Sequence, residues 1–153
     1  RHFENEVIRQ NKRAVDFFVM TNKTSINLYN IKNNYLINGD EDQLYRVFVN
    51  LIKNSSESFL EKKQKKADFK GKIDIEISED NDYIHIILID NGTGITDIKK
   101  VMTPYFTTKK KGTGLGLPIV SKIINEHSGE ITIINKKTEG VEINISLPKF
   151  NEK

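Results

Sequence analysis

The sequence contains no cysteine among its 153 residues. It therefore has no disulfide framework and no thiolate metal site, and this composition fits a reducing compartment. No apolar run approaches the roughly 20 residues that a membrane-spanning helix needs, and no secretory signal stands at the N-terminus. The first residue is Arg1 rather than Met, as expected for a piece of a longer protein.

Histidine is scarce as well, with three residues, His2, His85 and His127. None lies at metal-ligand spacing from a second histidine or a carboxylate, so we expect structural or surface roles for them. The formal net charge is only +3, which a solvated surface explains more simply than a nucleic-acid patch. No nucleic-acid partner is expected. Binding of nucleic acid through the lysine runs stays open as an alternative that predicts a steep salt dependence.

What the chain does contain is the composition of an ordinary globular domain, with 37% hydrophobic and 29% charged residues. No internal repeat and no low-complexity linker divides it. We therefore expect a single domain over residues 1–153 with one sizeable core.

Hydrophobic periodicity predicts the order α-β-β-α-β-β-α-β-β. This order predicts a two-layer α/β (α+β) sandwich, in which helices cover one face of a mixed, mostly antiparallel sheet. The nearly continuous apolar strand 83–89 is expected in the centre of the sheet with both faces mostly covered. The expected helices are 3–20, 40–61, a short one at 97–102, and 115–127, which Gly129 ends; the expected strands are 25–31, 35–37, 73–77, 83–89, 130–135 and 141–147, and the expected loops include 62–70 and 104–112.

Two asparagines stand four residues apart on the predicted helix 40–61, Asn50 and Asn54. Asparagine is unfavourable inside a helix because its side chain competes for backbone hydrogen bonds, so the pair asks for a reason. A neutral amide oxygen can ligate Mg²⁺ beside substrate phosphates. Taken alone, the pair is explained more simply as two surface asparagines in an Asn-rich chain.

A carboxylate, Asp90, ends the apolar strand, and Gly92 and Gly94 follow it at once. A carboxylate at a strand end can accept a hydrogen bond from an exocyclic amine, and glycine lets a ligand approach the backbone. The alternative is a tight turn after a buried strand, since Asp-Asn-Gly is a common turn sequence.

A second glycine cluster, Gly112, Gly114 and Gly116, leads into the predicted helix 115–127. The free N–H groups and the dipole at such a helix start suit phosphates. The cluster is not a P-loop, because no Gly-Lys-Ser/Thr follows, and it is a poor dinucleotide motif, because no strand precedes it. The alternative is a flexible helix N-terminus. Lys109–Lys111 can contact phosphates as point charges, although solvation is the simpler role for at least two of them.

The four patterns occur in the order Asn50-x-x-x-Asn54, Asp90-x-Gly92-x-Gly94, Phe106 with Thr107–Lys109, and Gly112-x-Gly114-x-Gly116. This series resembles the catalytic ATP-binding domain of two-component sensor histidine kinases, whose boxes are known as N, G1, F and G2. The resemblance covers about residues 24–148. The stretches PYFTTKKKGTGLGLPIV and KNSSES look like the NtrY/NtrB nitrogen-regulation branch of that family.

The resemblance implies the Bergerat α/β sandwich, shared with gyrase-, Hsp90- and MutL-type ATPases, and the cofactors ATP and Mg²⁺. It implies that Asn54 is the Mg²⁺ ligand with Asn50 as its partner in the catalytic site, and that Asp90 accepts from the adenine amine. It also implies that Phe106 anchors a mobile lid over ATP. The other residues it implies in nucleotide binding are Lys53, Gly92, Gly94, Ile95, Thr108, Lys109, Gly112, Thr113, Gly114, Leu115, Gly116 and Leu117.

Two departures from the family pattern stand out. Glu57 and Ser58 occupy positions where many members have a basic and then an aromatic residue. Phosphate contact is then expected from Lys53 or a lid lysine, and adenine stacking from another residue. Val141 follows Gly140 where threonine is common, so a polar contact near adenine is expected to be absent.

The resemblance also bears on the reaction. The ATPase relatives have a glutamate at the position of Asn50, and an amide cannot accept a proton from water in that way. Neutral imidazole already has a lone pair, so we expect slow hydrolysis and phosphoryl transfer to a histidine. The open alternatives are an ATPase of the same superfamily and a non-catalytic ATP-sensing module.

No phosphoacceptor motif of the histidine kinase type occurs in the chain. We therefore expect a catalytic domain alone, which binds Mg-ATP but does not phosphorylate itself unaided. Its partner is expected to be the dimerisation and phosphoacceptor domain of the same full-length protein, with a response regulator acting indirectly. The full-length protein is expected to be a membrane-anchored sensor kinase with this domain in the cytoplasm.

Overall fold

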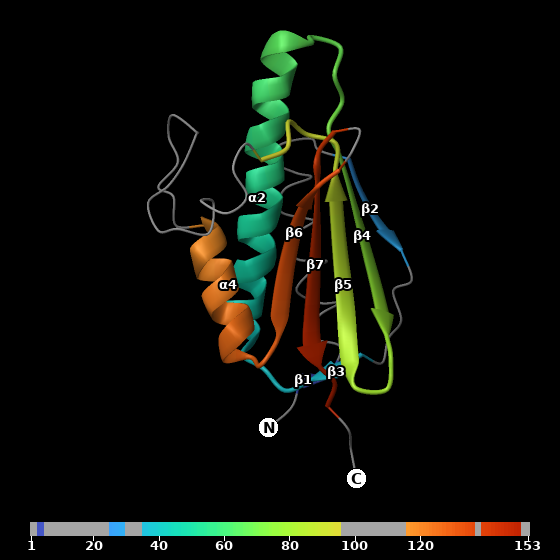
Figure 1. Ribbon diagram of the computed structural model, residues 1–153, viewed down its shortest axis with the longest axis vertical. Helices are drawn as coiled ribbons and strands as arrows, with labels where there is room; N and C mark the ends of the chain where they lie inside the picture. Colours follow the sequence, from blue (N-terminus) through green and yellow to red (C-terminus); the bar gives the residue numbers. More distant parts are fainter. Residues whose placement is uncertain (1–2, 5–24, 30–34, 96–115, 137–138, 151–153) are drawn as a thin grey trace.

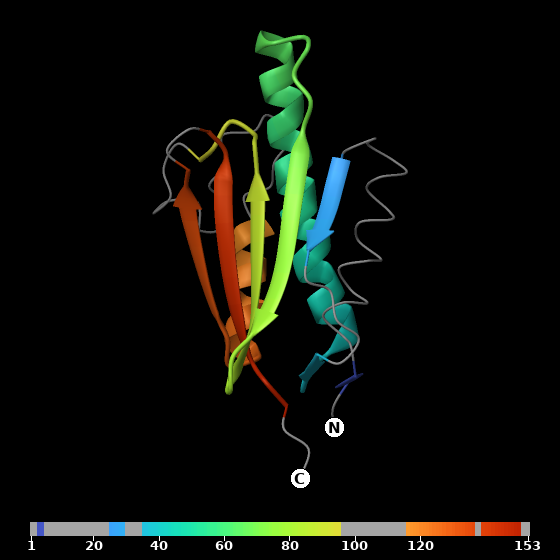
Figure 2. The ribbon, with the colours of Figure 1, turned by 90° about the vertical axis from the view of Figure 1, so that its right-hand side faces the viewer.

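The computed structural model describes residues 3–4, 25–29, 35–95, 116–136 and 139–150. Two helices lie against one face of a five-stranded sheet, which confirms the predicted two-layer sandwich (Figure 1 and Figure 2). The helices are α2 (Glu41–Lys65) and α4 (Gly116–Glu126). The strands, in order across the sheet, are β2 (Ser25–Tyr29), β4 (Lys72–Glu79), β5 (Tyr83–Asp90), β7 (Val141–Pro148) and β6 (Glu130–Asn135).

The sheet is mixed, as predicted. β5 is its central strand, and every neighbouring pair is antiparallel except β2 and β4, which run parallel. The last two predicted strands are present as β6 and β7, which pair antiparallel. A separate two-stranded sheet joins β1 (Phe3–Glu4) to β3 (Leu36–Ile37). The prediction of a helix beginning at Phe3 is therefore wrong, because this backbone pairs with a distant strand.

The core lies between the sheet and the two helices, because each central strand alternates buried apolar residues with more exposed ones. On β4 the side chains of Ile73, Ile75 and Ile77 are fully buried, as the alternation in the sequence predicts. From the helices, α2 contributes Leu44, Val47, Phe48, Leu51, Ile52 and Phe59, and α4 contributes Leu117, Val120, Ile123 and Ile124.

The face of the sheet away from α2 and α4 is covered less than the face on which these helices lie (Figure 2). On β5 the residues of that face include Ile87 and Ile89, which are half-buried. Tyr83 is the exposed residue of this strand, and the others are buried or half-buried, which agrees with the prediction that both faces of β5 are mostly covered.

Helix α2 begins where the sequence predicts and ends later. Asp40 caps it, since its Oδ1 accepts from the backbone N–H groups of Asp42 at 2.9 Å and Gln43 at 3.2 Å. The helix continues to Lys65, so the prediction that 62–70 is entirely a loop is wrong. Lysine and glutamine are good helix formers, and lysines in the last turn interact favourably with the helix dipole.

Helix α4 ends in a Schellman motif in which Ser128, rather than Gly129, takes the left-handed position. Ser128 takes the left-handed conformation with φ of 59°, and the Gly129 N–H bonds the Ile124 carbonyl at 2.9 Å. Gly129 is required for another reason. A Cβ atom on it would come within 2.4 Å of the Ser146 carbonyl oxygen on β7.

Several predicted segments lie outside the described residues. They are the remainder of the helix 3–20, the short helix 97–102 and the loop 104–112. Within the described part, neither helix combines the length and the apolar character that crossing a membrane requires.

Candidate functional site

The side chain of Asp90 stands at the end of β5 and is only 5% exposed. Its Oδ1 accepts hydrogen bonds from the backbone N–H groups of Gly92 at 3.0 Å and Val141 at 3.1 Å. Its Oδ2 accepts from the hydroxyl of Ser55, on α2, at 2.6 Å. All three partners donate, so the carboxylate acts as an acceptor through both of its oxygens.

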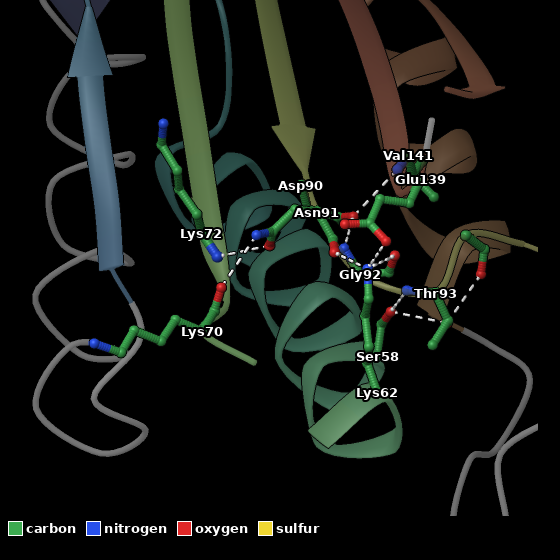
Figure 3. Close-up of polar contacts among 11 residues, drawn as sticks. Ser58, Lys62, Lys70, Lys72, Asp90, Asn91, Gly92, Thr93, Glu139 and Val141 are labelled. Carbon is green, nitrogen blue, oxygen red and sulfur yellow. Dashed lines mark hydrogen bonds and ion pairs between the residues drawn. The ribbon is translucent and has the colours of Figure 1, made fainter. Parts of the chain in front are cut away.

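The turn after Asp90 is held from α2 by Ser58 (Figure 3). The Ser58 Oγ accepts from the backbone N–H of Thr93 at 2.7 Å and lies 3.0 Å from the Thr93 hydroxyl. A Cβ atom on Gly92 would come within 2.1 Å of the same Oγ, so residue 92 must be glycine while Ser58 holds the turn. The position that often carries an aromatic residue in the family thus fixes the turn backbone in this chain.

The next residues of the turn are fixed to the end of β6. The side chain of Asn135 accepts from the Ile95 N–H at 2.8 Å and donates to the Ile95 carbonyl at 2.7 Å. Gly94, just before, has φ of 82°, which glycine adopts at little cost. The segment after β5 is therefore tied to a helix on one side and to a strand on the other.

The turn before β7 touches the same segment. Gly140 has φ of 90°, and a Cβ atom on it would come within 1.9 Å of the Asp90 carbonyl oxygen. Only glycine fits this approach. The following residue, Val141, lacks a polar side chain, but its backbone N–H still reaches the Asp90 carboxylate.

Lys62 ties three segments together near the end of α2 (Figure 3). Its ammonium donates to the Asn91 carbonyl at 2.9 Å, forms an ion pair with Glu139, and lies 4.7 Å from the centre of the Phe69 ring. Lys62 was expected in a solvated loop, but its side chain is only 15% exposed because these partners surround it. The hydrogen bond from Lys62 lowers the pKa of the Glu139 carboxyl.

The asparagine pair faces the start of α4. A Cβ atom on Gly116 would lie 3.6 Å from both the amide oxygen and the amide nitrogen of Asn54. Asn50, one turn earlier on α2, is half-buried like Asn54, whereas Lys53 is exposed. The structure thus brings Asn54 beside a helix start, where backbone N–H groups without intrahelical partners occur. An amide oxygen at such a place suits a hard cation such as Mg²⁺, which prefers oxygen ligands beside phosphate.

In the described part of the chain, no group of three or more histidine, cysteine, aspartate or glutamate side chains could hold a metal ion. Leu117, also predicted at the site, is buried in α4. The predicted residues Phe106, Thr108, Lys109, Gly112, Thr113, Gly114 and Leu115 lie outside the described residues.

Sequence reasoning missed the three α2 side chains that hold the Asp90 segment. Ser55, Ser58 and Lys62 stand at spacings of three and four residues, so they share one face of the helix. This spacing was a signal that could have found them. Their partners lie far away in the chain, 35 residues from Ser55 in the case of Asp90, which no local pattern predicts.

Two histidines have structural partners. His127, after α4, donates from Nδ1 to the Ile123 carbonyl at 2.8 Å, and its Nε2 accepts from the Asp40 backbone N–H at 3.0 Å. His85, on β5, lies 2.8 Å from the Asp80 carboxylate and 3.0 Å from the Ser146 hydroxyl. The hydrogen bond from His85 is the main reason that the pKa of Asp80 falls to about 2.

Comparison with known proteins agrees with this geometry. The family model of histidine kinase-, DNA gyrase B-, and HSP90-like ATPases matches residues 39–151. Sporulation kinase A of Bacillus subtilis is 40% identical over 120 residues, which are 77% of this chain and 18% of that protein. Sporulation kinase C of the same organism is 34% identical over 154 residues, 96% of this chain and 33% of that protein.

An NtrY-like sensor histidine kinase of Rickettsia felis is 38% identical over 118 residues, 74% of this chain and 19% of that protein. The predicted likeness to NtrY-like kinases is thus confirmed, and sporulation kinases share it at similar identity. The chain spans about a third or less of the length of these relatives.

Solved structures show the same fold. The catalytic domain of histidine kinase ThkA superposes with a TM-score of 0.79 at 25% identity, covering 97% of this chain and 98% of that one. The mycobacterial sensor histidine kinase MprB has a TM-score of 0.80 at 18% identity, covering 99% of both chains. With more than half of its length matched by the family model and the fold of histidine kinase catalytic domains, the chain belongs to the histidine kinase-, DNA gyrase B- and HSP90-like ATPase family.

Proposed function

We propose that this chain binds Mg-ATP and donates its γ-phosphoryl group to a histidine on a separate dimerisation and phosphoacceptor domain. The observation that carries the proposal is the buried Asp90 carboxylate, held by three donors beside the turn that Gly92 and Gly94 form. In a member of this ATPase family, such an acceptor suits the adenine amine. Ile95, whose backbone Asn135 fixes, continues the base-binding segment.

The phosphate end of the site is proposed at the start of α4. Asn54 would hold Mg²⁺ there with Asn50 beside it, and Gly116 and Leu117 open the helix. Bound Mg²⁺ would neutralise charge on the phosphates during transfer. Lys53 is a candidate phosphate contact from α2. The lid is proposed to include Phe106, Thr108, Lys109, Gly112, Thr113, Gly114 and Leu115.

The same arrangement favours transfer over hydrolysis. The amide of Asn50 cannot accept a proton from water, and a neutral imidazole nucleophile needs little help from a base. Positioning and electrostatic stabilisation would carry most of the reaction. We propose further that the acceptor domain belongs to the same full-length protein, that a response regulator acts downstream, and that this domain works in the cytoplasm.

A titration calorimetry experiment with a non-hydrolysable ATP analogue, with and without Mg²⁺, tests the binding step. We expect binding that Mg²⁺ strengthens. A folded sample without affinity for any adenine nucleotide in the presence of Mg²⁺ would refute the proposal.

Mixing the chain with a phosphoacceptor helical domain and γ-labelled ATP tests the transfer step. Labelled histidine is expected only in the mixture, not in the chain alone. ATP binding without any labelled histidine would instead favour an ATP-sensing module, and rapid release of labelled phosphate would favour an ATPase.

A further inference from the structure

Ser55, which contacts Asp90, is not among the residues to which a role in nucleotide binding has been given above. The Ser55 hydroxyl is 2.6 Å from Asp90 Oδ2, and the two side chains are 2% and 5% exposed. A hydroxyl donating to a carboxylate at this distance makes a strong, charge-assisted hydrogen bond. Neither partner is accessible enough for water to replace the other without cost.

The number of donors around Asp90 limits what the carboxylate can still accept. An ionised carboxylate offers about four lone-pair positions. In the described part of the chain, Gly92 and Val141 fill two positions on Oδ1, and Ser55 fills one on Oδ2. About one position is left, and it lies on the oxygen that Ser55 orients.

We propose that Ser55 is a positioning residue that makes Asp90 a reader of a single exocyclic N–H donor. The inference rests on the proposed nucleotide function and adds a base-specificity determinant to it. The two backbone donors fix Oδ1, and the Ser55 hydroxyl fixes the direction of the remaining lone pair on Oδ2. A purine with a 6-amino group fills that position, whereas a purine without the amine leaves it unpaired in a buried place.

Removing the Ser55 hydroxyl should lower the preference of the site for a purine with a 6-amino group. Without Ser55, Oδ2 has two open positions and no neighbour that fixes its direction. The 6-amino group is then bound less favourably, while a base that lacks it loses nothing further. The signature of positioning is therefore a change in the ratio of two affinities rather than a general loss of binding.

The test compares ATP with purine riboside triphosphate, its analogue without the 6-amino group, by calorimetry in the presence of Mg²⁺. Ser55→Ala should weaken ATP binding about tenfold, a loss typical of one hydrogen bond to a charged group, and change the affinity for the analogue less than about twofold. Ser55→Thr keeps the hydroxyl and should keep the ratio of the native chain.

Ser56→Ala is the matched control. Ser56 is the next residue on α2, is 8% exposed, and its hydroxyl has no hydrogen-bond partner among the residues that the structure describes. This variant should change neither affinity. If Ser55→Ala weakens both nucleotides equally, or leaves the ratio unchanged, the positioning role is wrong although ATP binding stands. If the native chain binds neither nucleotide, the proposed function itself is wrong.

Discussion

The carboxylate of Asp90 is the group on which the proposed base recognition depends. In Asp90→Asn, one acceptor oxygen becomes an NH₂ group, which faces donors on every side and can no longer accept from adenine. We expect ATP binding to weaken by more than about tenfold, equivalent to about 1.4 kcal/mol or more, while the fold persists. Calorimetry for affinity and circular dichroism for the fold check this outcome.

Asp82→Asn provides the control for this variant. Asp82 is exposed in the turn between β4 and β5, so the same chemical change there should leave affinity as it is. Unaltered ATP affinity in Asp90→Asn would count against the adenine assignment.

The amide of Asn54 lies at the proposed phosphate end of the same site. Because its proposed partner is Mg²⁺, Asn54→Ala should reduce Mg²⁺-dependent phosphoryl transfer at least about tenfold, and metal-free nucleotide binding much less. Transfer to an added phosphoacceptor domain, and binding in excess chelator, measure the two effects. Equal losses in both would reject the metal role. Asn125→Ala, at an exposed position of α4, serves as the control.

For single residues, the sequence predicts which side chains have a chemical role in the candidate site better than it predicts which side chains hold them in place. Asp90 and Asn54 could be proposed as site residues because each stands in a short pattern with its own chemical meaning. The spacing of Ser55 and Ser58 places them on one helix face, but their partners could not be predicted, because they lie in a turn that the chain reaches only after two further strands. The hydrogen bonds by which Asn135 fixes the backbone of Ile95 could not be predicted for the same reason, since 40 residues separate the two.

Among the elements, the end of α2 carries the clearest prediction. Lys62→Ala removes the donor to the Asn91 carbonyl and the ion pair with Glu139. We expect the free energy of unfolding to fall by about 1–2 kcal/mol, within the range for hydrogen bonds to charged groups, as measured by urea denaturation. The exposed neighbour Lys63 is the matched control, and Lys63→Ala should cost less than about 0.5 kcal/mol.

The β4–β5 hairpin carries a prediction about pH. The pKa of Asp80 is lowered from 3.8 to about 2 in the folded state, first by its hydrogen bond from His85 and then by backbone N–H groups of the turn. A lowered folded-state pKa gives stability that is present above about pH 4 and is lost as pH falls towards 2. Native unfolding free energy should therefore drop across this window more than that of Asp80→Asn. Parallel curves for the two proteins would contradict the assignment.

The ends of helices α2 and α4 show which features of an element the sequence predicts and which it does not. The cap at Asp40 was predictable because it acts on its own helix within a few residues. The extension of α2 through Lys65 was not predictable, because the composition of the lysine run is compatible with a solvated loop as well as with a helix end. Ser128 holds the left-handed position although the neighbouring glycine is the usual candidate, because β7 needs that glycine for close approach.

For the whole molecule, the sandwich could be predicted because its strands alternate buried and exposed residues and its helices have one apolar face. The order of the strands in the sheet could not be predicted. The parallel pairing of β2 with β4 joins residues 47 positions apart across helix α2, and nothing in either strand encodes it. The convergence of α2, β5 and the turn before β7 around Asp90 likewise follows from topology rather than from any single motif.

His127 has a consequence for motion across the molecule. It joins the last turn of α4 to the first residue before α2, through the Ile123 carbonyl and the Asp40 backbone N–H. The opposite end of α4 begins beside Asn54. Helix α4 therefore meets α2 near both of its ends, and a shift of its C-terminal end relative to α2 would have to break the hydrogen bond between His127 and the Asp40 N–H.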